Sequence, residues 1–259
     1  MKQLSRVLVA VDFSKPARAA FEQALALARE HDAELTVVHA VPAEKTFAWR
    51  AKARMALIAK LRQRAESSGV TFNVSVQHGD PAGVILLHAH SRRPDLVVVG
   101  THQRTGLDRL RTGSVAERVT LRATQPVLIV PPRRAGSTVR LFDNILVAVD
   151  FGTASKAALE QAVVLTKGRN RGLTVVHVTP GPASMGVLSH STGVPPYLYR
   201  FGAAEYQRLL TGNAWRRLNN SISRDISQAT QIRARVVAGT AATEIERVAS
   251  ELEDTKEQS

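Results

Sequence analysis

Residues 7–42 read VLVAVDFSKPARAAFEQALALAREHDAELTVVHAVP, and residues 145–180 read ILVAVDFGTASKAALEQAVVLTKGRNRGLTVVHVTP. The two stretches align without a gap, and 18 of the 36 positions are identical. Self-similarity of this kind indicates an internal duplication. Each copy has an apolar run ending in aspartate, then apolar residues at helical spacing, then a second apolar run. We therefore predict a strand–helix–strand unit in each copy.

The alternation of strands and helices continues beyond the first copy. The predicted elements are a helix near 47–67, a strand over 70–77, a helix begun by Asp80-Pro81, a strand at 96–99, a helix over 114–123 and a strand at 127–130. Aspartate is favoured at a helix N-cap and proline at the first helical position. The pattern predicts an α/β fold with an open parallel sheet covered on both faces, whose ligands bind beyond the carboxyl ends of the strands.

The length of 259 residues predicts two domains at about 100–150 residues each. The stretch PPRRAGSTVR at 131–140 has no periodicity and is rich in helix breakers. We expect a complete domain over 1–132, a linker over 133–142 and a second domain over 143–259. Because Gly79 corresponds to Gly239, we expect the second domain to lack its last two strands and to hold three.

An incomplete sheet exposes an unpaired strand edge and an uncovered apolar face. We therefore expect self-association, as a dimer or other homo-oligomer, or a protein partner that covers this edge.

Composition excludes several classes of protein. The absence of cysteine rules out disulfides, thiolate nucleophiles and cysteine-ligated metals. No stretch approaches the roughly 18 apolar residues of a membrane helix, so we expect a cytoplasmic protein with no membrane span. The formal charge is +13, and residues 1–140 hold 22 Lys and Arg against 11 Asp and Glu. This balance favours polyanions, with unspecific nucleic-acid binding among them.

The loop at 100–114, GTHQRTGLDRLRTGS, joins a predicted strand to the start of a helix. Backbone N–H groups and the helix dipole bind phosphate in this setting. Together with VAVDFS at 9–14, VVHAVP at 37–42 and QPVLIVP at 125–131, the loop resembles the universal stress protein family. The likeness is to tandem members, here with a truncated second domain. It implies a Rossmann-like fold of the adenine nucleotide alpha hydrolase-like type.

The resemblance also implies an adenine-nucleotide site. Nucleotide-binding members share a G-x2-G-x9-G-[ST] loop, which here corresponds to Gly100, Gln103, Gly113 and Ser114. By this likeness Asp12 and Val41 would border the adenine, Gly100 and Gly113 would let the backbone reach ribose and phosphates, and Ser114 would donate hydrogen bonds. Val115 is counted with this set. The implied cofactor is ATP, with Mg²⁺ as its possible companion.

Gln103 departs from the family pattern, because a glycine stands at this place in nucleotide-binding members. If that glycine has a positive φ or lies against the ligand, a glutamine side chain strains the backbone or fills ligand space. The amide can equally point outward or donate to a phosphate, so the sequence leaves the effect open.

Structural roles compete with these functional ones. Ser114 and Glu117 form a capping box. Asp12 could cap the helix that follows it or hydrogen-bond loop amides, and Asp150 repeats it in the second copy. His39 and His177 occupy equivalent positions, which favours a hydrogen-bonded imidazole over catalysis. The arginines at 50, 54, 62 and 64 are expected on a solvated helix face, with an anion-binding patch as the less favoured reading.

The sequence favours an adenine-nucleotide-responsive binding protein of the stress response, with its site in the first domain only. The loop lacks an obvious general base, so we expect at most a slow ATPase. The alternative is a nucleotide-free stress adaptor that acts through protein contacts. Polyanion binding through the basic first domain is a minor addition to either.

Overall fold

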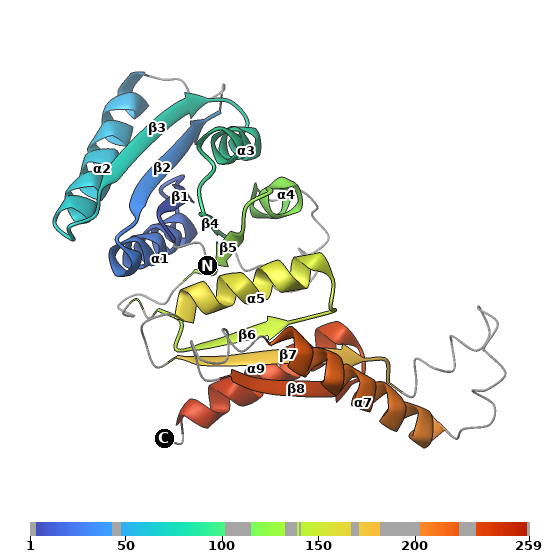
Figure 1. Ribbon diagram of the computed structural model, residues 1–259. Coiled ribbons are helices and arrows are strands. Elements are labelled where there is room, and N and C mark those ends of the chain that lie inside the picture. The colour runs from blue at the N-terminus through green and yellow to red at the C-terminus, as the bar shows by residue number, and fades with distance from the viewer. Residues whose placement is uncertain are drawn as a thin grey trace. The chain divides into compact units, whose positions relative to one another are not determined.

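The computed structural model describes residues 4–42, 48–101, 115–132, 139, 141–166, 171–181, 203–222 and 232–257. The chain divides into two compact units, Lys2–Leu141 and Phe142–Ser259. Each is an open sheet of parallel strands with helices packed against it (Figure 1). The predicted linker lies mostly outside the described residues, so the predicted domain limits stay a prediction.

The first unit holds a five-stranded sheet in the order β3-β2-β1-β4-β5. Its elements are β1 (Arg6–Ala10), α1 (Lys15–His31), β2 (Glu34–Val41), α2 (Ala48–Glu66), β3 (Phe72–His78), α3 (Pro81–Arg92), β4 (Leu96–Gly100), α4 (Val115–Arg122) and β5 (Val127–Val130). All neighbouring strands pair in parallel. The predicted alternation of five strands and four helices is confirmed, with limits that differ by no more than two residues.

The second unit holds a three-stranded parallel sheet in the order β6-β7-β8. Its elements are β6 (Asn144–Ala148), α5 (Thr153–Thr166), β7 (Gly172–Thr179), α7 (Ala203–Ser221), β8 (Ile232–Ala238) and α9 (Ala241–Glu257). The prediction of three strands is therefore confirmed among the described residues.

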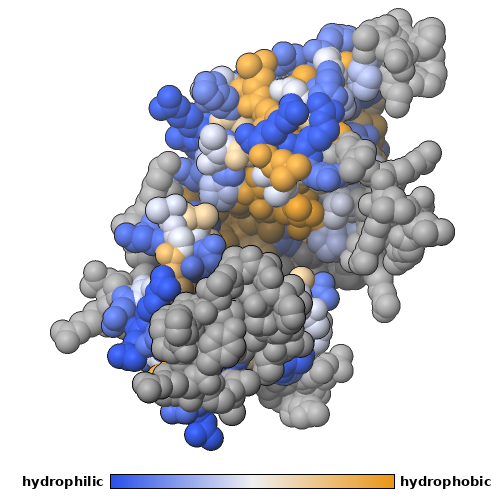
Figure 2. Space-filling model, turned by 90° about the vertical axis from the view of Figure 1, so that its right-hand side faces the viewer, coloured by the Kyte–Doolittle hydropathy of each residue, from blue (hydrophilic) through white to orange (hydrophobic). Residues whose placement is uncertain are grey.

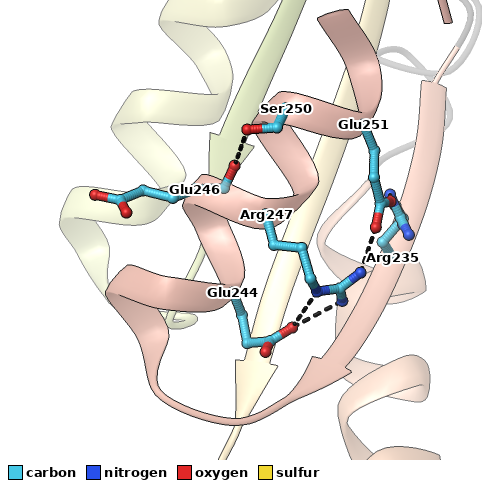
Figure 3. A network of polar contacts seen from close by, with 6 residues as sticks. All are labelled: Arg235, Glu244, Glu246, Arg247, Ser250 and Glu251. Atoms are coloured by element: carbon cyan, nitrogen blue, oxygen red, sulfur yellow. Dashed lines mark hydrogen bonds and ion pairs between the residues drawn. The ribbon is translucent and has the colours of Figure 1, made fainter. Parts of the chain in front are cut away.

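An ion-pair network holds α9 to β8 (Figure 3). Arg235 of β8 donates to the Glu251 carboxylate at 2.7 Å, and Arg247 donates both to Glu251 and, at 2.7 Å, to Glu244. Arg247 and Glu251 lie one helical turn apart, as do Glu244 and Arg247, which is the spacing at which helix side chains meet. The acidic stretch that includes Glu244 and Glu251 is thus part of a helix.

An N-cap side chain and a proline in the first turn mark the starts of α1 and α3. The Ser14 side chain accepts a hydrogen bond from Ala17 N at 3.3 Å, and the Asp80 side chain accepts one from Gly83 N at 2.9 Å. A proline follows each cap within the first helical turn. These are the favoured N-terminal residues of helices.

Helices cover both faces of the first sheet, with α1 and α2 on one side and α3 and α4 on the other (Figure 1). One core cluster joins Leu8, Val38, Val97 and Val99 of the strands to α3 and α4. On the face drawn in Figure 2, hydrophobic side chains of this unit gather in a patch bordered by hydrophilic ones. In the second unit a single cluster joins β6 and β7 to α5 and α7.

No helix among the described residues is long and apolar enough to cross a membrane.

The strand order reverses at β1, which lies between β2 and β4. In sheets of this class the crevice for ligands forms at such a reversal, beyond the carboxyl ends of the strands. Asp12, Val41 and Gly100 stand at or directly after the carboxyl ends of these three strands. The fold therefore brings predicted site residues from three parts of the chain to one edge.

Gly100 is where α1 crosses the end of β4. A Cβ atom added there would lie 2.5 Å from the carbonyl carbon and oxygen of Pro16 and 2.9 Å from Ala17 N. These are backbone atoms in the first turn of α1, so they cannot rotate away. The close approach of a helix to a strand end is thus sufficient reason for a glycine at this position.

Replacing Gly100 by alanine should destabilise the chain by about 1–3 kcal/mol, because the new methyl group overpacks the contact with α1. The matched control is Gly212→Ala, in the interior of α7, where an added Cβ meets nothing within 4 Å. That change should stabilise by up to about 1 kcal/mol through helix propensity. Urea unfolding measures both, and a Gly100→Ala protein as stable as the wild type would contradict the packing argument.

Candidate functional site

A cavity of about 380 Å³ lies beyond the carboxyl ends of β1 and β2. Its walls come from the strand ends, from α2 and from the start of α3. The lining residues are Asp12, Phe13, His39, Ala40, Val41, Pro42, Ala53, Arg54, Leu57 and Pro81. The volume is within the usual range for small-molecule sites, which are mostly apolar with a few polar groups. Asp12 and Val41, predicted from different strands, both line this one cavity.

Asp12 orders the turn between β1 and α1. Its Oδ1 atom accepts a hydrogen bond from Ser14 N at 3.0 Å, and Ser14 itself caps α1. Asp12 thus hydrogen-bonds a loop amide, which is one of its two predicted structural roles, and the helix cap itself is Ser14. The Asp12 side chain is exposed, and its other carboxylate oxygen has no hydrogen-bond partner among the described residues. It can accept a hydrogen bond from a ligand.

His39 ties the end of β2 to the end of β1. Its Nδ1 atom lies 2.7 Å from the carbonyl oxygen of Val11. Since a carbonyl only accepts, Nδ1 carries the proton and donates. The ring also lies against Phe13, with 4.7 Å between centroids. A hydrogen-bonded, packed imidazole was the predicted role, and these contacts confirm it.

The pKa of His39 is lowered from its ordinary value of 6.5, chiefly because burial disfavours the charged ring. The positive charge of Arg54 lowers this pKa further, while the Val11 carbonyl and Asp12 oppose the shift. The charged groups around the ring are thus Arg54 and Asp12, both of which line the cavity.

Phe13 has a φ of +64°, and its copy Phe151 has +65°. A bulky residue with positive φ is rare, and it costs on the order of 1–3 kcal/mol unless its surroundings hold it. In both units the Phe ring packs on the histidine that holds the strand end. This contact supplies the support that the strained backbone needs.

Arg54 brings a positive charge to a largely apolar cavity. Its side chain is half-buried, whereas two other arginines of α2 serve elsewhere: Arg62 lies over Phe72 at 5.2 Å and Arg64 pairs with Glu22 at 3.2 Å. The predicted solvated face therefore describes most of this helix and not Arg54. Nothing in the spacing of the arginines at 50, 54, 62 and 64 distinguishes Arg54, so its place at the cavity depends on how α2 packs.

The remaining predicted site residues have separate positions. Gly100 ends β4 beneath α1, and Val115 begins α4, where its half-buried side chain packs against the core cluster. Gln103, Gly113 and Ser114 lie outside the described residues, so the predicted phosphate loop is not described and the Ser114–Glu117 capping box stays a prediction.

The second unit repeats the contact between the histidine and the strand-end carbonyl, and it differs in the hydrogen bonds of its aspartate. His177 Nδ1 lies 2.7 Å from the Val149 carbonyl oxygen, just as His39 contacts Val11. Asp150 is held by its own loop, because its Oδ1 atom accepts from Gly152 N at 2.8 Å and from the Ser155 hydroxyl. These hydrogen bonds lower the pKa of Asp150. A structural role thus accounts for this carboxylate.

Side chains of α7 occupy the place beside the strand ends of this unit. Thr179, the copy of Val41, accepts a hydrogen bond from Gln207 Nε2 at 3.2 Å and donates to the Val237 carbonyl at 3.2 Å. The guanidinium of Arg217 lies 4.3 Å from the Phe151 ring centroid. Phe151 and Thr179, which correspond to Phe13 and Val41 of the cavity, therefore contact α7 in this unit.

Two further histidines of the first unit, His88 and His90, lie on α3. His88 Nε2 lies 3.1 Å from both Ser75 Oγ and Gln77 Oε1, and His90 is exposed. The described residues contain no group of three or more His, Cys, Asp or Glu side chains that could hold a metal ion.

Comparisons with known proteins identify the family. The model of the universal stress protein family matches residues 4–131 and 141–253. A universal stress protein of Methanocaldococcus jannaschii is 32% identical over 137 residues, which are 48% of this chain and 81% of that protein. The crystal structure of a universal stress protein from Archaeoglobus fulgidus covers 97% of this chain and 83% of its own, at 18% identity and a TM-score of 0.69. This last likeness concerns the fold alone.

One further structure is a universal stress protein in complex with cAMP. It covers 51% of this chain at 22% identity and a TM-score of 0.43, and the ligand is a property of that protein.

Burial of His39 should make the stability of the chain depend on pH. The folded pKa lies below 6.5, so the unfolded chain binds a proton more readily than the folded one. The contribution of His39 is complete above pH 6.5 and is lost as the pH falls from 6.5 through the lowered folded pKa. Asparagine at position 39 keeps an N–H donor near Val11 and does not titrate. His39→Asn should therefore flatten the free energy of unfolding between about pH 7 and pH 5.

Urea unfolding at a series of pH values measures this slope for both proteins. The slope that remains in the variant includes His88, whose pKa burial also lowers. Identical slopes for the two proteins would show that His39 is not the linked group.

Proposed function

Because this chain belongs to the universal stress protein family, we propose that its first unit binds an adenine nucleotide, ATP by expectation, in a stress-response role. One observation carries the proposal: the cavity at the ends of β1 and β2 that both Asp12 and Val41 line. The family resemblance assigns these two residues to the adenine, and they follow the first strand and end the second strand of one strand–helix–strand unit. Their meeting at one cavity supports that assignment.

The chemistry of the cavity suits a nucleoside. Val41, Pro42 and Leu57 offer apolar surface for a planar base. The second carboxylate oxygen of Asp12, which has no partner within the described ranges, can accept from an amino or hydroxyl group. Arg54 supplies a positive charge at the cavity wall, and its guanidinium group can bind a phosphate group of the ligand. The surplus of positive charge in residues 1–140 also attracts anions.

The phosphates are assigned to the loop that leads into α4. Gly100 and Val115 mark its two ends, and Gln103, Gly113 and Ser114 complete the set. Their N–H groups, together with the dipole of α4, would bind the phosphate oxygens. Magnesium, where present, would come with the phosphates, because Mg²⁺ is commonly held by substrate phosphates and few protein ligands.

The first unit is the proposed location, and the second unit is proposed to have a regulatory or assembly role. The contacts of Thr179 with Gln207 and of Arg217 with Phe151 support this division, since they use the groups that would face a ligand. Nucleotide hydrolysis is at most a slow accompaniment in this proposal. The cytoplasmic location expected from the sequence stays a prediction.

Filling the cavity from α2 tests the binding site directly. Ala53 lines the cavity and is exposed, so Ala53→Trp should place an indole in the ligand space without disturbing the core. We expect the affinity for ATP to fall by roughly tenfold or more, because the bound base and the indole cannot share the space. Ala56→Trp is the control, since Ala56 is exposed on the same helix and is not among the lining residues.

Isothermal titration calorimetry with ATP, and with GTP for comparison, measures the affinities. Binding that Ala53→Trp and Ala56→Trp leave equally strong would refute the location of the site. If wild-type protein bound no nucleotide at about millimolar ligand, the weakest affinity commonly measured, the nucleotide-free adaptor would replace the proposal.

Gln103→Gly tests the departure from the family loop. If the glutamine side chain fills ligand space, the variant should bind ATP more tightly than the wild type, by roughly tenfold for the relief of about 1.4 kcal/mol. Equal affinities would show that this side chain points away from the ligand. Weaker binding by the variant would assign the amide to the phosphates instead.

A further inference from the structure

Because the chain is duplicated, the outer edge of β6 in the second sheet can be compared with the edge of β1 that pairs with β4 in the first. β6 is the copy of β1, with the sequence ILVA in place of VLVA at an offset of 138 residues. β1 pairs with β2 on one side and β4 on the other, whereas β6 pairs only with β7 among the described residues. The second unit therefore presents the edge that β4 occupies in the first.

The backbone groups on this edge can be assigned by the period of two along a strand. The Asp143 carbonyl accepts from Gly172 N, and Val149 N donates to the Val176 carbonyl, so these residues face β7. The alternate residues, Asn144, Leu146 and Ala148, direct their N–H and C=O groups to the outer edge. In the first unit the equivalent group of Arg6, its carbonyl, accepts from Asp95 N at 2.8 Å, at the start of β4.

Helix α5 presents the matching side-chain surface. In the first unit α1 contacts β4 and β5, and Ala19 and Ala20 are 7% and 0% exposed. Their copies Ala157 and Ala158 are exposed on α5. Leu146 is likewise only half-buried, whereas its copy Leu8 is 1% exposed. The surface that seats β4 in one unit is thus present and uncovered within the other.

The edge also lacks the usual protection against pairing. Exposed edge strands normally carry charged residues, proline or a bulge. Residues 144–148, NILVA, include neither a charge nor a proline. The opposite edge of the same sheet, β8, carries Arg233 and Arg235. The difference points to an edge that is kept available for pairing.

We propose that the outer edge of β6, with the adjoining face of α5, is a docking site for an extended apolar strand of another polypeptide. The strand is of the Leu-Val-Val-Val-Gly kind and runs parallel to β6. The first unit defines this occupant, because β4 has that sequence and pairs in parallel with the near-identical β1.

The docking site is expected to require a glycine at the end of the docked strand. In the first unit the first turn of α1 lies so close to Gly100 that a Cβ would be 2.5 Å from the Pro16 backbone. α5 begins at Thr153, which is the copy of the first residue of α1, Lys15. The first turn of α5 therefore crosses the edge at the equivalent place, and a strand docked there needs glycine at its fifth residue.

A labelled peptide tests the proposal on the full chain. The probe is residues 95–101, DLVVVGT, flanked by lysines for solubility, and fluorescence anisotropy measures its binding. Ala158→Arg places a long charged side chain on the proposed seat at a position that is already exposed, so the fold should be unaffected. Thr153→Arg is the matched control, because both it and its copy Lys15 are exposed. Unchanged urea midpoints for both variants establish that each is folded.

We expect the wild-type chain to bind the peptide, Ala158→Arg to weaken binding by roughly tenfold or more through the steric and charge conflict, and Thr153→Arg to change it by less than about twofold. A peptide with valine in place of its glycine should bind at least about tenfold more weakly than the native peptide. Binding that ignores Ala158→Arg or the glycine replacement would overturn the proposal, as would no binding at about 1 mM peptide.

Light scattering tests whether a second copy of this chain, and not the proposed strand, occupies the β6 edge. Self-association that Ala158→Arg abolishes and the peptide does not displace would place a second copy on the edge and overturn the proposed strand.

Discussion

The hydrogen bond from His39 to the Val11 carbonyl fixes the point at which the two central strands of the first unit end. Without His39, the Val11 carbonyl, which directly follows β1, would need a water molecule as its hydrogen-bond partner. The imidazole instead joins the two strand ends and gives the Phe13 ring a surface to pack against. The walls of the cavity depend on this arrangement, because Asp12 and Phe13 leave the sheet directly after Val11.

Much of the fold was predictable because its signals are local and repeated. Two copies of VAVDF fixed the strand ends, and Asp80-Pro81 marked a helix start. The cavity was predictable only in part. Asp12 and Val41 end strands, so topology alone brings them together, whereas Arg54 lies on a helix whose orientation depends on tertiary packing. Gly100 illustrates a second difficulty: its glycine has a structural cause in α1, 84 residues earlier in the sequence, which a loop motif does not reveal.

The two units share one scaffold and differ in the contacts that side chains make beside their strand ends. The clamp of histidine on a carbonyl oxygen and the left-handed phenylalanine occur in both. Thr179 in place of Val41 gives α7 a hydrogen-bond partner, and Arg217 covers the second phenylalanine. In the second unit these side chains therefore contact α7, whereas the corresponding side chains of the first unit line the cavity. Conserved backbone geometry is thus compatible with separate roles for the two halves.

The left-handed phenylalanines have a consequence for how the duplicated halves can diverge. Each reverses the chain within the four residues between strand and helix, so the following helix starts at the same place in both copies. A connection this short and this tightly shaped tolerates neither insertion nor deletion without moving a whole helix. Length variation is confined to other connections, and the sequence bears this out: the offset between the copies is 138 residues at these turns and 160 at the glycines after β3 and β8. The two copies of this chain therefore differ in length only away from these turns, whose own length is the same in both.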